Sequence, residues 1–216
     1  MAQLIQTDIP APHGLLEGLL RLPDEQTPAE SSPKMAALVC HPHPQFGGTM
    51  HNKVVFRIAA ALVDHGIPAL RFNFRGVGRS TGSYDDGRGE ADDIRAGLDA
   101  LDARFPGAPL LLAGFSFGAW TGLPVGAADP RVTHLLGAGV PVRLLQVSSL
   151  AGCVKPKLII QGELDEYGPR DQLEAWYANL PEPKRLTIIP GADHFFTKQQ
   201  NELAAALDEG LRAWEL

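Results

Sequence analysis

Short apolar runs alternate along the chain with longer stretches in which apolar residues recur every three or four positions. The short runs have the length of strands, and the wholly apolar ones are typical of strands buried on both faces of a sheet. The longer stretches predict helices with one apolar face. Expected strands cover residues 2–9, 15–22, 35–40, 67–74, 110–113, 132–140, 157–161 and 186–189, and expected helices cover 54–64, 89–104, 117–127, 172–180 and 198–214.

The order of these elements predicts the fold class. The first two strands, joined by a turn at residues 10–14, read as an antiparallel hairpin at a sheet edge. From residue 35 onward strands alternate with helices, which predicts an α/β fold with a mostly parallel, twisted sheet covered by helices on both faces. Residues 23–34 are polar and proline-rich, so we expect an exposed loop. Without a repeat or a second core, residues 1–216 are expected to form one domain.

Composition and net charge limit the kinds of molecule that the protein is expected to bind. Hydrophobic residues make up 44% of the chain and charged residues 20%, as in an ordinary globular protein. A formal net charge of -6 gives no general attraction to nucleic acid or to acidic membranes, so we expect a small-molecule partner. The two cysteines, Cys40 and Cys153, have no metal-ligand or disulfide-scaffold spacing, and no leader or membrane-spanning run is visible. We therefore expect a cytoplasmic location, whereas the oligomeric state is not predicted.

The most informative stretch is residues 110–120, LLLAGFSFGAW, in which an apolar strand ends at Gly114 and a run compatible with a helix follows Ser116. This context matches the Gly-x-Ser-x-Gly turn that lifts a serine hydroxyl out of a sheet at the start of a helix. The glycines, Gly114 and Gly118, are needed because the turn is too tight for a Cβ and strained at its centre. The motif predicts a nucleophilic Ser116, and it requires an acid and then a histidine later in the chain.

Both requirements are met at the carboxyl ends of predicted strands. Asp165 follows the strand at residues 157–161, and we prefer it to Glu163 and Glu166 because its shorter side chain suits orienting an imidazole. His194 follows the strand at residues 186–189, and it is the histidine that lies after the acid and on the same sheet edge. The predicted roles are Ser116 as nucleophile, His194 as general base and Asp165 as the acid that orients it.

A tetrahedral oxyanion needs two preorganised N–H donors. One is expected to be the backbone N–H of Phe117, the residue after the nucleophile. The second should come from the loop after residues 35–40, where two prolines have no N–H and His43, Gln45 and Phe46 remain as candidates. His43 is preferred, and the other two stay open.

Other patterns are assigned structural roles. His41 and His43 have a spacing seen in metal sites, but no carboxylate cluster accompanies them, so no metal is predicted. The segment RGVGRS lacks the lysine and the glycines of a phosphate-binding loop, so no nucleotide cofactor is predicted either. Arg75, within that segment, is expected to pair with an early-helix acid such as Asp93.

Several aromatic residues near Ser116 could line an acyl pocket. Ordinary core packing explains Phe46, Phe195 and Phe196 equally well, whereas the motif fixes the positions of Phe115 and Phe117 beside Ser116. Trp120 is expected to pack against the sheet. The candidates for substrate contact are Phe46, Phe115 and Phe195, with Phe117 and Phe196 as further aromatic neighbours.

With these residues assembled, the chain resembles a small serine hydrolase of the α/β-hydrolase superfamily, in the compact group related to dienelactone hydrolases. The resemblance rests on HPHPQFGGTMHNKVV, RFNFRGVGRSTGSY, GFSFG, QGELDE and PGADHFF. It implies the same roles for Ser116, Asp165 and His194, although dienelactone hydrolases use a cysteine where this chain has Ser116. Many members carry a lid, for which residues 141–156 are too short, so an open, lidless site for small substrates is expected.

The sequence therefore predicts a hydrolase of small carboxylic esters or thioesters that works through an acyl-enzyme. A peptidase or amidase with the same three residues is one alternative, because the leaving group is not visible in the sequence. A catalytically idle binding protein on the same fold is the other, because fold alone does not settle function.

Overall fold

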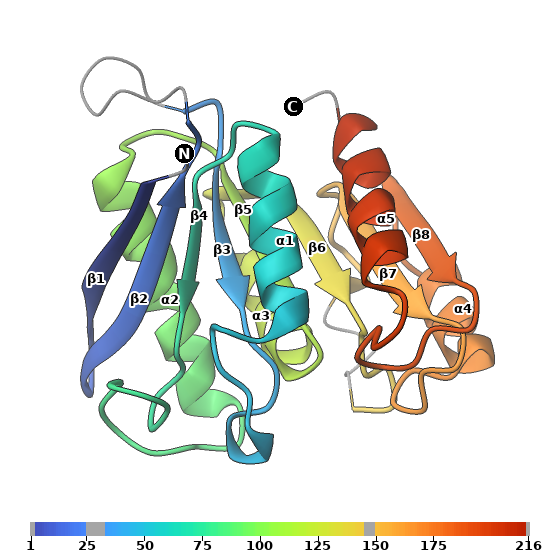
Figure 1. Ribbon diagram of the computed structural model, residues 1–216, viewed down its shortest axis with the longest axis horizontal. Coiled ribbons are helices and arrows are strands. Elements are labelled where there is room, and N and C mark those ends of the chain that lie inside the picture. The colour runs from blue at the N-terminus through green and yellow to red at the C-terminus, as the bar shows by residue number, and fades with distance from the viewer. Residues whose placement is uncertain (1–2, 25–32, 145–149, 215–216) are drawn as a thin grey trace.

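The computed structural model describes residues 3–24, 33–144 and 150–214. Within these ranges eight strands form one sheet, in the order β1-β2-β4-β3-β5-β6-β7-β8 (Figure 1). The strands are β1 (Gln3–Ala11), β2 (Gly14–Leu22), β3 (Ala36–Cys40), β4 (Ala69–Phe72), β5 (Leu110–Phe115), β6 (Val132–Ala138), β7 (Lys157–Gly162) and β8 (Lys184–Ile189). The helices are α1 (Lys53–Asp64), α2 (Arg88–Arg104), α3 (Phe117–Ala128), α4 (Arg170–Ala178) and α5 (Gln200–Arg212), with a 3-10 turn η1 (Pro44–Phe46).

The pairing of the strands confirms the predicted α/β sheet. β1 and β2 form an antiparallel hairpin at one edge, and β2 pairs antiparallel with β4. From β4 to β8 every neighbouring pair is parallel. The predicted loop at residues 23–34 lies largely outside the described residues, as does the middle of the connection at residues 141–156.

Several strand ends differ from the predictions: β4 covers only Ala69–Phe72, β1 runs to Ala11 and β8 begins at Lys184. Two further differences, at the ends of β5 and β6, have clear local reasons. β5 runs on to Phe115, because Phe115 still pairs with Ala138 of β6. β6 stops at Ala138 instead of residue 140, because Gly139 takes a left-handed φ of 54° and the N–H of Val140 donates to the Gln161 side chain. Both differences lie at the carboxyl edge of the sheet.

Helices cover both faces of the sheet. α1 and α5 pack on one face, and α2 and α3 pack on the other, as Figure 1 shows, and α4 joins the second layer. All five residues of β3 are buried, as a strand between two helical layers requires. In α1 the apolar residues recur every three to four positions, which places Val55, Ile58 and Leu62 on the buried face. No helix within the described ranges combines the length and the apolar character that crossing a bilayer requires.

The loop between β4 and α2 is held by the ion pair predicted from the sequence. The Arg75 guanidinium lies 2.8 Å from Asp93 Oδ1, and the backbone N–H of Arg75 donates to Asp93 Oδ2 at 2.9 Å. The Asp93 side chain is fully buried. A Cβ on Gly89 would lie 1.9 Å from the guanidinium, so this glycine lets Arg75 lie flat against α2. The contact belongs to the scaffold, on the side of the sheet where α2 and α3 pack.

Replacing Arg75 by alanine is expected to lower the thermal midpoint by roughly 6–12 °C, because it leaves a buried carboxylate without its partner at a cost of about 3 kcal/mol. Turnover of the surviving folded enzyme should change much less. Thermal unfolding and ester hydrolysis measured side by side test this. The double variant Arg75→Ala/Asp93→Ala should recover part of the stability, since the unpaired charge is gone. Collapse of turnover in a fully stable Arg75→Ala protein would overturn the structural role.

Candidate active site

Ser116 lies at the turn between β5 and α3, in the backbone conformation that the motif predicts. Its φ is 54° and its ψ is −118°, a region that non-glycine residues rarely occupy. A Cβ on Gly114 would lie 2.4 Å from the carbonyl oxygen of Gly118, and a Cβ on Gly118 would lie 2.4 Å from that of Cys40. Both glycines are therefore required by the close approach of α3 to β5 and β3.

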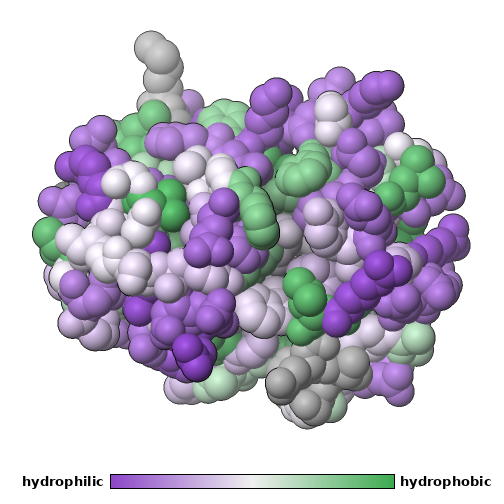
Figure 2. All heavy atoms as spheres, turned by 90° about the horizontal axis from the view of Figure 1, so that it is seen from below, coloured by the Kyte–Doolittle hydropathy of each residue, from purple (hydrophilic) through white to green (hydrophobic). Residues whose placement is uncertain are grey.

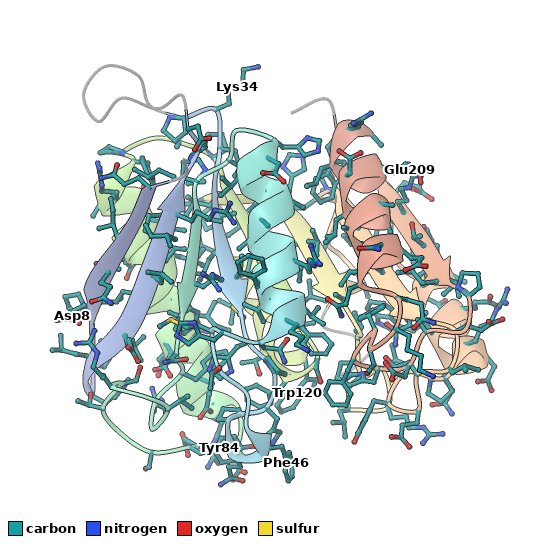
Figure 3. All side chains as sticks on the ribbon, viewed as in Figure 1. Asp8, Lys34, Phe46, Tyr84, Trp120 and Glu209 are labelled. Carbon is teal, nitrogen blue, oxygen red and sulfur yellow. The ribbon has the colours of Figure 1, made fainter. Side chains whose placement is uncertain are left out.

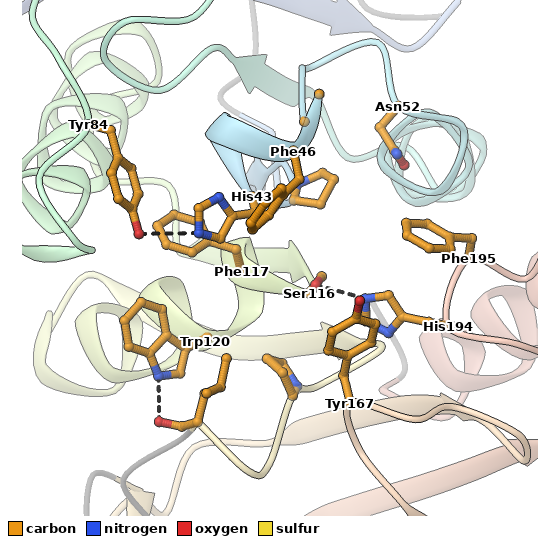
Figure 4. Close-up of a pocket in the computed structure, with 15 residues that line it drawn as sticks. His43, Phe46, Asn52, Tyr84, Ser116, Phe117, Trp120, Tyr167, His194 and Phe195 are labelled. Carbon is orange, nitrogen blue, oxygen red and sulfur yellow. Dashed lines mark hydrogen bonds between the residues drawn. The ribbon is translucent and has the colours of Figure 1, made fainter.

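The three predicted side chains form one hydrogen-bonded chain. His194 Nδ1 lies 2.7 Å from Asp165 Oδ2, and His194 Nε2 lies 2.8 Å from Ser116 Oγ, the contact drawn in Figure 4. Because a carboxylate only accepts, Nδ1 carries the proton, and Nε2 is free to accept from the serine hydroxyl. Asp165 and His194 are both almost fully buried. In this arrangement the imidazole can take the serine proton during attack on a carbonyl carbon.

Four donors hold the Asp165 carboxylate in place. Oδ1 accepts from the backbone N–H groups of Tyr167 at 2.8 Å and Gly168 at 3.2 Å. Oδ2 accepts from His194 and from the side-chain amide of Gln161, which donates at 2.8 Å. Gln161 is itself fully buried, and its Oε1 accepts from the N–H of Val140. Sequence reasoning missed Gln161, although a glutamine ending the apolar run LIIQG of a central strand was an available signal.

The structure separates the three candidates for the second oxyanion donor. The N–H of Gln45 donates to His43 Nδ1 at 3.2 Å, and the N–H of Phe46 donates to the His43 carbonyl at 3.1 Å. Among the residues that the structure describes, the N–H of His43 has no such acceptor. Phe117 is the first residue of α3, where the backbone N–H has no partner within the helix. His43 and Phe117 thus keep their N–H groups available.

The His43 ring fixes the loop that carries this N–H. Its Nδ1 accepts from Gln45, so the proton lies on Nε2, which donates to the Tyr84 hydroxyl at 3.2 Å. The ring also lies against those of Phe46, Tyr84 and Phe117, with centroids 4.5, 5.1 and 4.9 Å away. Burial among these rings lowers the pKa of His43, which favours the neutral form that this bonding requires. Both ring nitrogens of His43 are hydrogen-bonded, and so are both ring nitrogens of His41. Neither histidine of the HxH pair therefore offers a free ring nitrogen to a metal.

His41 is fully buried below the same loop. Its Nδ1 donates to the Pro42 carbonyl at 2.6 Å, and its Nε2 accepts from the N–H of Phe74 at 3.0 Å. This neutral tautomer ties the loop after β3 to the end of β4. Burial lowers the pKa of His41 to about 4. The side chain therefore couples the loop after β3 to the neighbouring strand only while it is uncharged.

His41 should make the folded protein less stable in acid. Between about pH 4 and 6.5 the unfolded chain binds a proton at this site and the folded chain does not, so stability is present above this window and is lost as the pH falls through it. The loss amounts to about 3 kcal/mol, complete near pH 4. Urea unfolding across the window should show a flatter pH dependence in His41→Asn than in the wild type. The same slope in both proteins would contradict this origin.

A pocket of about 400 Å³ opens around Ser116 at the carboxyl edge of the sheet, the edge that faces the viewer in Figure 2. Aromatic side chains surround it, and Figure 4 shows how they converge on the serine. Its lining consists of Pro42, His43, Phe46, Gly47, Gly48, Asn52, Tyr84, Ser116, Phe117, Trp120, Pro141, Leu144, Tyr167, His194 and Phe195. Phe46 is 83% exposed and Phe195 53% exposed, so both stand at the open rim.

The structure corrects the prediction that Phe115 contacts the substrate, and it decides the positions of Phe196 and Trp120. Phe115 is fully buried, faces the layer of α1 and α5, and packs 5.2 Å from the His194 ring, so it supports the histidine and does not line the pocket. Phe196 is fully buried in that layer too. Trp120 packs against the core on the face covered by α2 and α3 and also lines the pocket, where its Nε1 donates to the Leu144 carbonyl at 2.8 Å. The spacing in the sequence was an available signal, because Trp120 lies four positions after Ser116 and so shares one face of the helix with it.

Sequence reasoning also missed three polar residues of the lining. Tyr84 comes from the loop before α2, Tyr167 follows Asp165, and Asn52 caps α1. Each comes from a segment whose position relative to Ser116 depends on the fold. Across the described part of the chain, no group of three or more histidine, cysteine, aspartate or glutamate side chains is arranged to hold a metal ion.

A mostly parallel sheet with a strained serine at a strand–helix turn, an acid and a histidine on later strand ends defines the class of α/β hydrolases. A family model described as "Alpha/beta hydrolase domain" matches residues 36–212 of the chain. The chain therefore belongs to the alpha/beta hydrolase family.

Individual relatives agree with this assignment. The chain is similar to uncharacterized protein RP471 of Rickettsia prowazekii, at 38% identity, covering 93% of this chain and 85% of that protein. It is similar to XC6422 of Xanthomonas campestris, a solved serine hydrolase described as lacking a lid, at 36% identity and a TM-score of 0.88, covering 98% and 95% of the two chains. A serine hydrolase homologue from Coxiella burnetii matches at 36% identity and a TM-score of 0.85, covering 96% and 97%. The predicted lidless α/β-hydrolase fold is confirmed.

Proposed function

We propose that the protein is a serine esterase or thioesterase that acts on small substrates through an acyl-enzyme. The observation that carries the proposal is the continuous hydrogen-bonded chain from Asp165 through His194 to Ser116. A binding protein that had lost catalysis would have no need of both contacts together with a strained serine backbone. The hydrolase class follows from the family, and the ester or thioester substrate is the proposal.

In the proposed mechanism, Ser116 Oγ attacks the substrate carbonyl carbon while His194 Nε2 takes the hydroxyl proton. The N–H groups of Phe117 and His43 stabilise the oxyanion. The bond from the carbonyl carbon to the leaving group breaks, and His194 returns the proton to that leaving group. Water then attacks the acyl-enzyme with His194 again as base, which releases the acid and restores Ser116. Asp165 keeps the imidazole in the required tautomer and stabilises its charged form.

The pocket supports small, uncharged acyl groups. Histidine is the only titratable type with a basic nitrogen in its lining, and no aspartate, glutamate, lysine or arginine of the described chain lines it. A volume of about 400 Å³ suits a short aliphatic or a single-ring acyl group. Both cysteines are free thiols, which supports the cytoplasmic setting expected from the sequence.

Burst kinetics with p-nitrophenyl acetate and butyrate test the proposal. We expect a stoichiometric burst of p-nitrophenol and a fluorophosphonate adduct that mass spectrometry maps to Ser116. Ser80, whose hydroxyl donates to the Asn73 carbonyl at 2.7 Å, serves as an internal control and should stay unlabelled. The matching p-nitroanilide distinguishes an amidase, because an esterase should cleave it far more slowly. Folded protein that neither hydrolyses the esters nor takes up the probe would contradict the proposal.

A further inference from the structure

A second cavity lies beside the catalytic pocket and shares two of its walls. It has a volume of about 350 Å³, and it shares Asn52 and Phe195 with the pocket around Ser116. It opens between the start of α1 and the loop before α5. Unlike the aromatic pocket, it is lined mainly by polar side chains: Thr49, His51, Asn52, Lys53, Val54, Phe195, Thr197 and Gln200.

Two polar side chains of this cavity have hydrogen-bond donors that remain available to a ligand. Asn52 Oδ1 accepts from the N–H groups of Val54 and Val55, so the cap uses the oxygen and leaves the side-chain NH₂ for a ligand. The hydroxyl oxygen of Thr49 accepts from the N–H of His51, so its proton can be donated elsewhere. Asn52 lines both cavities, and Figure 4 shows where it stands in the catalytic pocket.

The charge of the cavity is positive. Lys53 lines it, and none of the ion pairs among the described residues involves this lysine. Thr49, Asn52 and Lys53 together offer a hydroxyl, an amide and an ammonium, and no aspartate or glutamate of the described chain stands in the wall. Such a donor-rich wall recognises an anionic oxygen group such as a carboxylate or a phosphate.

The position of the group that protonates the leaving group indicates which part of the substrate enters this cavity. His194 must return its proton to the leaving-group atom, so the leaving group lies on the histidine side of Ser116. Phe195 and Asn52 lie on that side in Figure 4, whereas Phe117, Tyr84 and Trp120 lie on the other. The acyl group therefore occupies the aromatic side, and the leaving group extends past Phe195 toward Lys53.

We propose that the physiological substrate is an ester or thioester of an apolar acid whose leaving group carries an anionic carboxylate or phosphate, held by Asn52, Lys53 and Thr49. This inference rests on the proposed function and specifies its substrate class. When Ser116 attacks, the carbonyl–oxygen or carbonyl–sulfur bond breaks. His194 then supplies the proton, and the anionic alcohol or thiol leaves through the polar cavity.

The test compares three esters of butanoate. The probes are 4-carboxyphenyl butanoate, 4-(phosphonooxy)phenyl butanoate and the neutral 4-carbamoylphenyl butanoate, with each kcat/KM corrected for uncatalysed hydrolysis. We expect the wild type to prefer one or both anionic esters, and the preferred anion distinguishes a carboxylate from a phosphate ligand. Raising the ionic strength should reduce that preference, because salt screens exposed charges.

Two variants locate the preference in this cavity. Lys53→Met should lower the ratio of kcat/KM for the anionic ester to that for the neutral ester by about 3- to 10-fold. Asn52→Asp should lower the same ratio, because aspartate caps α1 equally well but removes the amide donors and repels an anion. Lys34→Met removes the same charge at the opposite end of the molecule, as Figure 3 shows, and should leave the ratio unchanged.

The outcomes separate this inference from the function on which it rests. Equal corrected rates for neutral and anionic esters, or an unchanged ratio in both Lys53→Met and Asn52→Asp, would overturn the anionic leaving group while leaving the esterase intact. An equal fall of the ratio in Lys34→Met would overturn it too, because the preference would then reflect overall charge. Failure to hydrolyse any ester would contradict the proposed function and this inference with it.

Discussion

Replacing Ser116 by alanine is expected to lower kcat for p-nitrophenyl butyrate by about 10⁴- to 10⁶-fold. The substitution removes the one oxygen that His194 Nε2 contacts at 2.8 Å, so no acyl-enzyme can form. The fold should survive, because the backbone N–H of Ser116 still donates to the Ala138 carbonyl at 3.0 Å and alanine adds no atoms. Residual turnover above the uncatalysed rate would come from the oxyanion donors and from binding alone.

The matched measurements are the burst amplitude, the steady-state rate and the thermal midpoint of the same preparation. A lost burst at an unchanged midpoint assigns the chemistry to Ser116. If the alanine variant kept a stoichiometric burst, a different nucleophile would be acting. Cys40 is a poor substitute, because it is fully buried and burial raises the pKa of its thiol well above the usual range.

The second large effect is expected for Asp165→Asn, which should lower kcat by about 10⁴-fold. Three of the four donors that surround the carboxylate are N–H groups of Tyr167, Gly168 and Gln161, each of which needs an acceptor. An asparagine must turn its NH₂ toward one oxygen position, where it faces a donor. If the NH₂ meets His194, the imidazole takes the tautomer with its proton on Nε2, which can no longer accept from Ser116.

Glu166→Gln is the matched control for this prediction. It neutralises a carboxylate in the same loop, next to Asp165 in the chain, but the Glu166 side chain is exposed and does not contact His194. Its kcat should stay within about 2-fold of the wild type, which corresponds to a change of only a few tenths of a kcal/mol in the activation free energy. Comparable losses in both variants would mean that the charge of the loop, and not the orientation of His194, governs the rate.

Much of this architecture could be predicted because short patterns in the sequence specify it. Strands such as β3 are recognisable because burial on both faces requires every residue to be apolar. The Gly-x-Ser-x-Gly turn is recognisable because its residues are close in the sequence and its first glycine is required by a contact between one strand and the helix that follows it. Asp165 and His194 could be placed because parallel strands bring their carboxyl ends to one edge, so order along the chain predicts proximity in space.

Contacts between segments far apart in the sequence could not be predicted in the same way. The sequence left three candidates for the second donor, and only the structure shows that the N–H groups of Gln45 and Phe46 are paired within their own turn, which supports the proposal of His43. The role of Gln161 depends on the turn after β7, which aims the amide and the Asp165 carboxylate at each other. Both depend on hydrogen-bond geometry, which cannot be predicted from residue type alone.

The sequence by itself determined the fold class, the strained serine and the residues proposed for catalysis, because each follows from a short pattern with one physical solution. The tertiary structure alone decided on which side of the sheet each aromatic residue lies. Phe115 turned away from the pocket and Trp120 turned into it, because strand and helix ends fix the direction of a side chain only after the layers have packed. It likewise decided that α1 and the loop before α5 enclose a polar cavity, because those two segments lie far apart in the sequence and meet only where α1 and α5 pack on the same face of the sheet.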